Sequence, residues 1–149
     1  MSYKPLVLII GVTGRTGGDI ANGVLATGSF VSHTNSDFHS FILILSKRVA
    51  AIVRPESIDK PEIAKLKAAG VDIRPGDIVS DSVEKLTSLL QGVDILISTV
   101  LPFTDQKPVL KAAKTAGVKR VLPSEFGPFV PKGLMPFIDE VRSAFFCEE

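Results

Sequence analysis

The sequence has 149 residues, of which 45% are hydrophobic and 22% charged, and its formal net charge is +1 at pH 7. This length predicts one domain, and the near-neutral charge argues against a nucleic-acid-binding surface. The single cysteine, Cys147, excludes an internal disulfide and a cysteine cage for a metal. We expect a cytoplasmic protein without a membrane partner, because no secretory signal and no apolar stretch of the ~20 residues that span a bilayer is found.

Short β-branched stretches alternate with helical patterns along the chain. Strands are predicted at residues 6–10, 49–53, 71–74, 93–98 and 118–122, and helices near 16–26, 61–69, 83–90 and 108–116. Asp81 is the predicted N-terminal cap of the third helix, and Gly28, Gly70, Gly92 and Gly117 are predicted helix ends. Because parallel strands need right-handed crossovers, we predict an α/β fold, a Rossmann-type doubly wound sheet with strand order 3-2-1-4-5.

A glycine-rich loop, GVTGRTGG at residues 11–18, follows the first strand and precedes the first helix. In this context Gly11 permits the tight turn off the strand, and Gly14 removes a side chain where backbone must approach a pyrophosphate. Gly17 lets the helix lie close to the strand. The helix N-terminus then offers free N–H groups to phosphates. The alternative is a tight turn that binds no ligand.

The end of the second strand carries a second signal for a dinucleotide. NAD enzymes usually place an acidic residue there for the ribose hydroxyls, whereas an arginine suits the 2′-phosphate of NADP. Arg54 stands at this place and therefore predicts NADP(H), since its planar fork matches a phosphate. Arg15 in the glycine loop is a further candidate for phosphate charge. Ordinary exposed arginines are the alternative for both.

Residues 31–47 do not fit the usual spacing of this fold. Arg54 follows Gly17 by 37 positions, where ~20 is typical, and deleting residues 31–47 restores that spacing. Our hypothesis is a translated retained intron, because codons for the first and last residues can hold splice boundaries; the alternative is a genuine surface insertion. Since His33 and His39 both fall in this segment, we expect neither a metal site nor acid–base roles for them.

Five stretches at the predicted strand ends carry a specific resemblance. They are residues 11–17, 54–55, 76–77, 98–100 and the PSEFG sequence at 123–127. Together they resemble the NmrA-like branch of the atypical short-chain dehydrogenase/reductases, which includes isoflavone-reductase-like proteins, pinoresinol reductases and phenylcoumaran benzylic ether reductases. The PSEFG stretch is the most discriminating, since a generic Rossmann protein has no reason to carry it.

The resemblance implies an NADPH-dependent oxidoreductase that acts on a small aromatic or hydrophobic substrate. It equally allows a non-catalytic NAD(P)-sensing regulator that binds a protein partner. The residues that it places at the cofactor are Gly11, Thr13, Gly14, Arg15, Thr16 and Gly17 at the pyrophosphate, Arg54 at the 2′-phosphate, Thr99 and Val100 beside the adenosine, and Ser124, Glu125 and Phe126 near the nicotinamide.

The catalytic lysine of that family is not found where the resemblance places it. It commonly follows an Ile-Asp-Glu-like stretch, which here is residues 137–140, and the next residue is Val141. Lys132 lies in a Pro-Lys-Gly turn and is a poor substitute. Family members are roughly twice as long, so we expect a single Rossmann domain over 1–149, truncated before the later strands and the substrate lobe, with an aberrant tail at 141–149. Cofactor binding without turnover is the expected behaviour, with no catalytic residue assigned.

Overall fold

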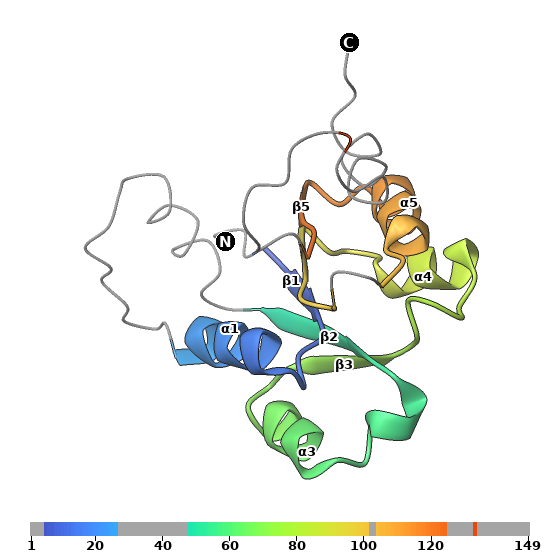
Figure 1. Cartoon of the computed structure of the whole chain (residues 1–149). Coiled ribbons are helices and arrows are strands. Elements are labelled where there is room, and N and C mark those ends of the chain that lie inside the picture. The colour runs from blue at the N-terminus through green and yellow to red at the C-terminus, as the bar shows by residue number, and fades with distance from the viewer. Residues whose placement is uncertain (1–4, 27–47, 102–103, 125–132, 134–149) are drawn as a thin grey trace.

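The computed structural model of the chain describes residues 5–26, 48–101, 104–124 and 133, and its trace is shown in Figure 1. The expected insertion at 31–47, Gly28, Glu125, Phe126 and the tail at 141–149 lie outside the described residues. Five parallel strands form one sheet in the order β3-β2-β1-β4-β5, which confirms the predicted order. The strands are β1 (Val7–Ile10), β2 (Val49–Val53), β3 (Asp72–Pro75), β4 (Ile95–Ser98) and β5 (Arg120–Leu122).

The three central strands are buried along their whole length, as their continuous apolar sequences predict. Residue Ile10 pairs in register with Ile52 on one side and with Ser98 on the other. The carboxyl ends of β1, β2 and β4 therefore meet at one edge of the sheet. In open α/β sheets, ligands bind at this edge, where the strand order reverses.

Helices cover both faces of the sheet (Figure 1). They are α1 (Arg15–Ala26), α3 (Pro61–Ala68), α4 (Val83–Leu89) and α5 (Lys107–Ala116), with a short 3-10 turn, η1 (Pro55–Ser57), after β2. Ala21 and Ile63, from α1 and α3, pack in one core with Ile9, whereas Leu86 and Val109, from α4 and α5, pack in the other. This three-layer arrangement is the doubly wound fold that the alternating sequence predicted.

Most predicted helix ends are confirmed, and one predicted cap is wrong. Gly70, Gly92 and Gly117 all have positive φ, as a glycine that ends a helix often does. Ser82, rather than Asp81, caps α4, and its hydroxyl accepts a hydrogen bond from the Lys85 N–H. The physical reason is that a carboxylate oxygen of Asp81 is engaged by the Asp77 N–H, 2.8 Å away.

Asp94 ties three strands together at the amino edge of the sheet, opposite the candidate site. Its buried carboxylate accepts the Leu6 N–H at 2.9 Å and contacts the Lys119 ammonium group at 2.9 Å. Its carbonyl oxygen also accepts the Lys119 N–H. Because a buried carboxylate is costly unless it is paired, this cluster is best explained as structural.

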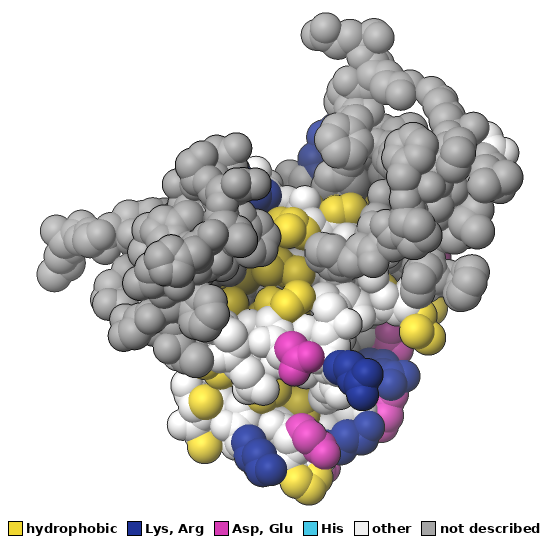
Figure 2. All heavy atoms as spheres, turned by 60° about the vertical axis from the view of Figure 1, so that its left-hand side comes forward, with side chains coloured by type: hydrophobic (Ala, Val, Ile, Leu, Met, Phe, Trp, Pro, Cys, Tyr) yellow, Lys and Arg dark blue, Asp and Glu magenta, His cyan; other side chains and the backbone are white. Residues whose placement is uncertain are grey.

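In the described part of the chain, no helix has the length and apolar character needed to cross a bilayer. In the lower part of the view in Figure 2, where the described side chains are visible, basic and acidic side chains lie intermixed.

Candidate functional site

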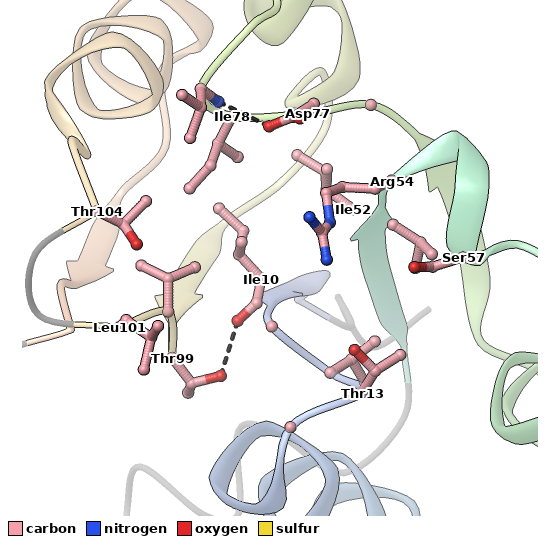
Figure 3. A pocket seen from close by; sticks show the side chains of 17 residues that line it. Ile10, Thr13, Ile52, Arg54, Ser57, Asp77, Ile78, Thr99, Leu101 and Thr104 are labelled. Atoms are coloured by element: carbon pink, nitrogen blue, oxygen red, sulfur yellow. Dashed lines mark hydrogen bonds between the residues drawn. The ribbon is translucent and has the colours of Figure 1, made fainter. Parts of the chain in front are cut away.

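A cavity of about 570 Å³ opens at the carboxyl edge of the sheet (Figure 3). It lies where β1, β2, β3 and β4 end, and each of these strand ends contributes to its walls. The lining residues are 10–14, 52–54, 57, 76–79, 99–101 and 104. Its size and its place at the reversal of strand order are those of a nucleotide site in an α/β sheet.

The glycine loop forms one wall, and it is shaped by close backbone contacts. The Gly14 N–H donates to the Gly11 carbonyl at 2.9 Å, and the Gly14 carbonyl accepts the first helical bond, from the Gly18 N–H at 2.8 Å. Gly11 has φ +84°, and a Cβ on Gly17 would lie 2.2 Å from the Gly11 carbonyl oxygen. Both glycines are therefore required by geometry. The first N–H groups of α1, which have no acceptor within the helix, remain available for an anion.

Thr99 holds this loop from the neighbouring strand end. Its N–H and its hydroxyl both donate to the Ile10 carbonyl, at 2.9 Å and 2.8 Å. A Cβ on Gly11 or on Gly17 would come within 2.8 Å or 2.5 Å of the Thr99 hydroxyl oxygen. The hydroxyl thus fills the space that the two glycines leave. Thr99 lines the cavity, and it also positions the loop, a role that sequence reasoning missed.

The second wall follows β2 and consists of side chains. Figure 3 shows the Arg54 guanidinium turned toward the space that the glycine loop also faces. The Arg54 Nε lies 3.4 Å from a carboxylate oxygen of Glu56, and both side chains are more than 60% exposed. An ion pair this exposed is weak, so it leaves the terminal nitrogens of the fork available for a ligand.

The third wall is the loop between β3 and α4, which is braced by carboxylates. Asp77 accepts the Val79 N–H at 2.9 Å, and Asp81 accepts the Asp77 N–H at 2.8 Å. Lys85 lies 2.7 Å from the other oxygen of Asp81. The hydrogen bond from Lys85, followed by that from the Asp77 N–H, holds the pKa of Asp81 below its usual value. The Gly76–Asp77 pair was noted in the sequence only as part of the resemblance, and this bracing was not foreseen.

Apolar side chains border the mouth of the cavity. Ile78 is buried in the wall, whereas Val79 and Leu101 are 62% and 75% exposed, high values among the large apolar residues that the structure describes. All three line the cavity. Apolar surfaces at a cavity mouth suit a flat, partly apolar group such as a purine base.

The structure brings together half of the residues expected at the cofactor. Those that line the cavity are Gly11, Thr13, Gly14, Arg54, Thr99 and Val100. Arg15 and Thr16 are exposed at the start of α1 outside this lining, and Gly17 is buried beneath it. The Ser124 hydroxyl donates to the Val100 carbonyl, which places Ser124 beside the end of β4. Glu125 and Phe126 lie outside the described residues, and no cluster that could hold a metal occurs among the residues that are described.

Comparison with known proteins identifies the family: the chain belongs to the NmrA-like family, which matches residues 3–134. Asnovolin J 5',6'-dehydrogenase of Aspergillus novofumigatus is 35% identical over 90% of this chain, and an isoflavone reductase homolog of Nicotiana tabacum is 36% identical over 85%. In each case the match covers only 37% of the relative, so the chain spans well under half the length of these curated proteins.

Solved structures give the same result. A structure from work on pinoresinol-lariciresinol and phenylcoumaran benzylic ether reductases is 28% identical, with a TM-score of 0.69 over 96% of this chain and 46% of that one. The leucoanthocyanidin reductase–NADPH complex from Vitis vinifera is 26% identical, with a TM-score of 0.62 over 92% of this chain and 41% of that one. Relatives of known structure thus include a protein with NADPH bound.

Proposed function

We propose that the chain binds NADP(H) in the cavity at the carboxyl edge of the sheet, as the dinucleotide-binding part of an NADPH-dependent reductase. The observation that carries the proposal is the position of Arg54, which directly follows β2 and faces the same cavity as the glycine loop. A cation there matches the 2′-phosphate, the group that distinguishes NADP from NAD.

Each part of the cofactor has a chemically suitable counterpart. The glycine loop and the first turn of α1, with Thr13, Arg15 and Thr16, would hold the diphosphate. The apolar rim of Ile78 and Leu101, together with Thr99 and Val100, would border the adenosine. Ser124, Glu125 and Phe126 are proposed near the nicotinamide on the strength of the resemblance alone.

For the reaction, we propose cofactor binding without turnover by this 149-residue chain. When bound, NADPH supplies a hydride, and a reductase of this kind also needs a group that transfers a proton. Val141 stands where the resemblance places a lysine for that task. The family relationship suggests the reduction of a small aromatic substrate, but we do not propose that this chain catalyses it by itself. The alternative is a regulator that binds NAD(P) and a protein partner, because such a protein would also bind the cofactor without turnover.

Titration calorimetry of Arg54→Ala with NADPH and NADH tests the cofactor assignment. Loss of a charge-assisted contact should raise the Kd for NADPH by about ten- to a hundredfold. The Kd for NADH should change much less. Arg48→Ala is the matched control, because Arg48 is exposed and precedes β2 at the opposite edge of the sheet. Equal losses for both cofactors would show that Arg54 does not hold the 2′-phosphate.

An assay of NADPH oxidation over a panel of small aromatic substrates tests the second half of the proposal. We expect tight NADPH binding and no oxidation above the protein-free rate. Turnover by the 149-residue chain would overturn the assignment of binding without catalysis, and it would leave the cofactor site unaffected.

A further inference from the structure

A buried serine lies next to Arg54 in the cavity wall. Ser57 is only 4% exposed, yet it lines the cavity. Three other polar residues in the described part of the chain are also buried: Ser98, Asp94 and Gln106. Asp94 and Gln106 accept hydrogen bonds, and Ser98 does not line the cavity. Ser57 is thus a buried serine that lines the cavity in which we propose the cofactor binds.

The backbone of η1 fixes the position of this serine. The Ser57 N–H donates to the Arg54 carbonyl at 2.8 Å, and the Ser57 carbonyl accepts the Lys60 N–H at 3.3 Å. Pro55 begins the turn and restricts its backbone. The main chain of Ser57 is therefore satisfied within the turn, and only its hydroxyl is left to meet a ligand.

The hydroxyl of Ser57 has no hydrogen-bond partner among the described residues, and Figure 3 shows it on the cavity side of η1, near Arg54 and Thr13. Ser57 is buried as a residue, yet it lines a cavity that Arg54 also lines, and a hydroxyl in such a wall is suited to an oxyanion. A phosphate group has several oxygens, so it could accept hydrogen bonds from both side chains.

We propose that the Ser57 hydroxyl donates to the 2′-phosphate of NADP(H) and so acts with Arg54 as a residue that determines cofactor selectivity. This inference rests on the proposed binding of NADP(H). Arg54 supplies charge from an exposed, flexible side chain, whereas Ser57 supplies a donor at a position that the backbone fixes. The pair therefore recognises the 2′-phosphate both by its charge and by its place.

The test compares ligands that differ only in the 2′-phosphate, namely 2′,5′-ADP against 5′-AMP and NADP⁺ against NAD⁺. For Ser57→Ala, calorimetry should show about a fivefold weaker affinity for 2′,5′-ADP and NADP⁺. Affinity for 5′-AMP and NAD⁺ should stay within about twofold, because neither carries the group that Ser57 contacts. Ser57→Asp should abolish the preference for NADP⁺, since it places a negative charge beside the phosphate.

Two controls separate this role from a structural one. Ser57→Cys keeps the side-chain shape with a poor donor and should reproduce the loss seen for alanine, while thermal unfolding reports any variant that fails to fold. Ser88→Ala removes an exposed hydroxyl of α4, remote from the cavity, and should change no affinity. Equal losses for both members of each ligand pair would overturn the inference.

The outcomes also distinguish this inference from the proposal beneath it. A wild-type chain with no preference for NADP⁺ over NAD⁺ would overturn the NADP(H) assignment itself. A wild-type preference that disappears in Arg54→Ala but persists unchanged in Ser57→Ala would overturn only the role of Ser57.

Discussion

The glycine-loop wall of the cavity and the β2 wall are formed in opposite ways. In the glycine loop, a side chain is excluded at Gly17 because backbone fills the space, as the 2.2 Å approach of a Cβ there to the Gly11 carbonyl oxygen shows. After β2, the wall consists of the side chains of Arg54 and Ser57. The first wall suits the diphosphate that all nicotinamide dinucleotides share, and the second suits the one phosphate that distinguishes them. Substitutions should therefore separate affinity from selectivity.

The largest expected effect is for Gly17→Ala, which should weaken NADPH and NADH alike. The added methyl group would overlap the Gly11 carbonyl, so the loop must shift, at a cost of about 1–3 kcal/mol in the free energy of unfolding. Misaligned N–H donors should then lower both affinities by roughly tenfold or more. Calorimetry with both cofactors measures the affinities, and urea unfolding measures the stability.

Gly23→Ala is the matched control for this prediction, because Gly23 lies in the same helix with nothing within 4 Å of an added Cβ. It should raise stability by roughly 0.5–1 kcal/mol and leave both affinities unchanged. A Gly17→Ala chain that loses NADPH but keeps NADH would contradict the division of labour between the two walls.

A smaller effect is expected for Thr99→Val, which acts on the glycine loop through its support. Valine removes the hydrogen bond from the hydroxyl to the Ile10 carbonyl, keeps the one from the N–H, and puts a methyl group against Gly11 and Gly17. We expect a loss of about 1 kcal/mol in stability and of about fivefold or less in affinity for both cofactors. Differential unfolding with and without each cofactor measures both quantities.

Thr99→Ser retains the hydroxyl and should behave almost as the wild type. Thr115→Val removes a comparable hydroxyl-to-carbonyl bond on the exposed surface of α5 and should leave affinity unaltered. A change in the ratio of NADPH to NADH affinity for Thr99→Val would mean that this residue contacts the part of the cofactor that carries the 2′-phosphate.

The same contrast explains how much the sequence could predict. The strands, the glycine loop and the place of Arg54 after β2 were predictable because each depends on residues adjacent in sequence. The strand order was predicted from the alternation of strands and helices, and it is confirmed. The Thr99 contact joins residues 89 positions apart, so no local pattern contains it. Sequence reasoning also missed Ser57, since a serine in a turn is commonly exposed and its burial follows from the path of η1.

One carboxylate near the third wall, that of Asp81, was assigned wrongly from the sequence for a related reason. Asp81 has the residue type and position of a helix cap, and only the folded loop shows that its carboxylate binds Asp77 instead. Capping rules consider only the residues at one helix end, whereas this loop also forms part of the cavity wall. The insertion at 31–47 stays a prediction, as do the roles of Glu125 and Phe126.

The smallest expected effect concerns that loop and is best measured as a pH dependence. The pKa of Asp81 is lower in the folded chain than in the unfolded chain, so its ionised form stabilises the fold at pH values above its unfolded pKa. That contribution should disappear as the pH falls through the folded pKa. Asp81→Asn should therefore lower stability near pH 7 by less than about 1 kcal/mol, because Lys85 is half exposed. The difference from the wild type should narrow toward pH 3.

Guanidinium unfolding of both chains between pH 3 and pH 7 measures this difference. Lys85→Met tests the physical cause, since it removes the first contributor to the lowered pKa and leaves the Asp77 bond in place. Its pH dependence should lie between those of the wild type and Asp81→Asn. The ratio of NADPH to NADH affinity should stay constant in both variants, because the β3–α4 loop touches neither Arg54 nor Ser57 through any hydrogen bond found in the described chain. A changed ratio would mean that the third wall of the cavity, like the second, contributes to the selectivity between the two cofactors.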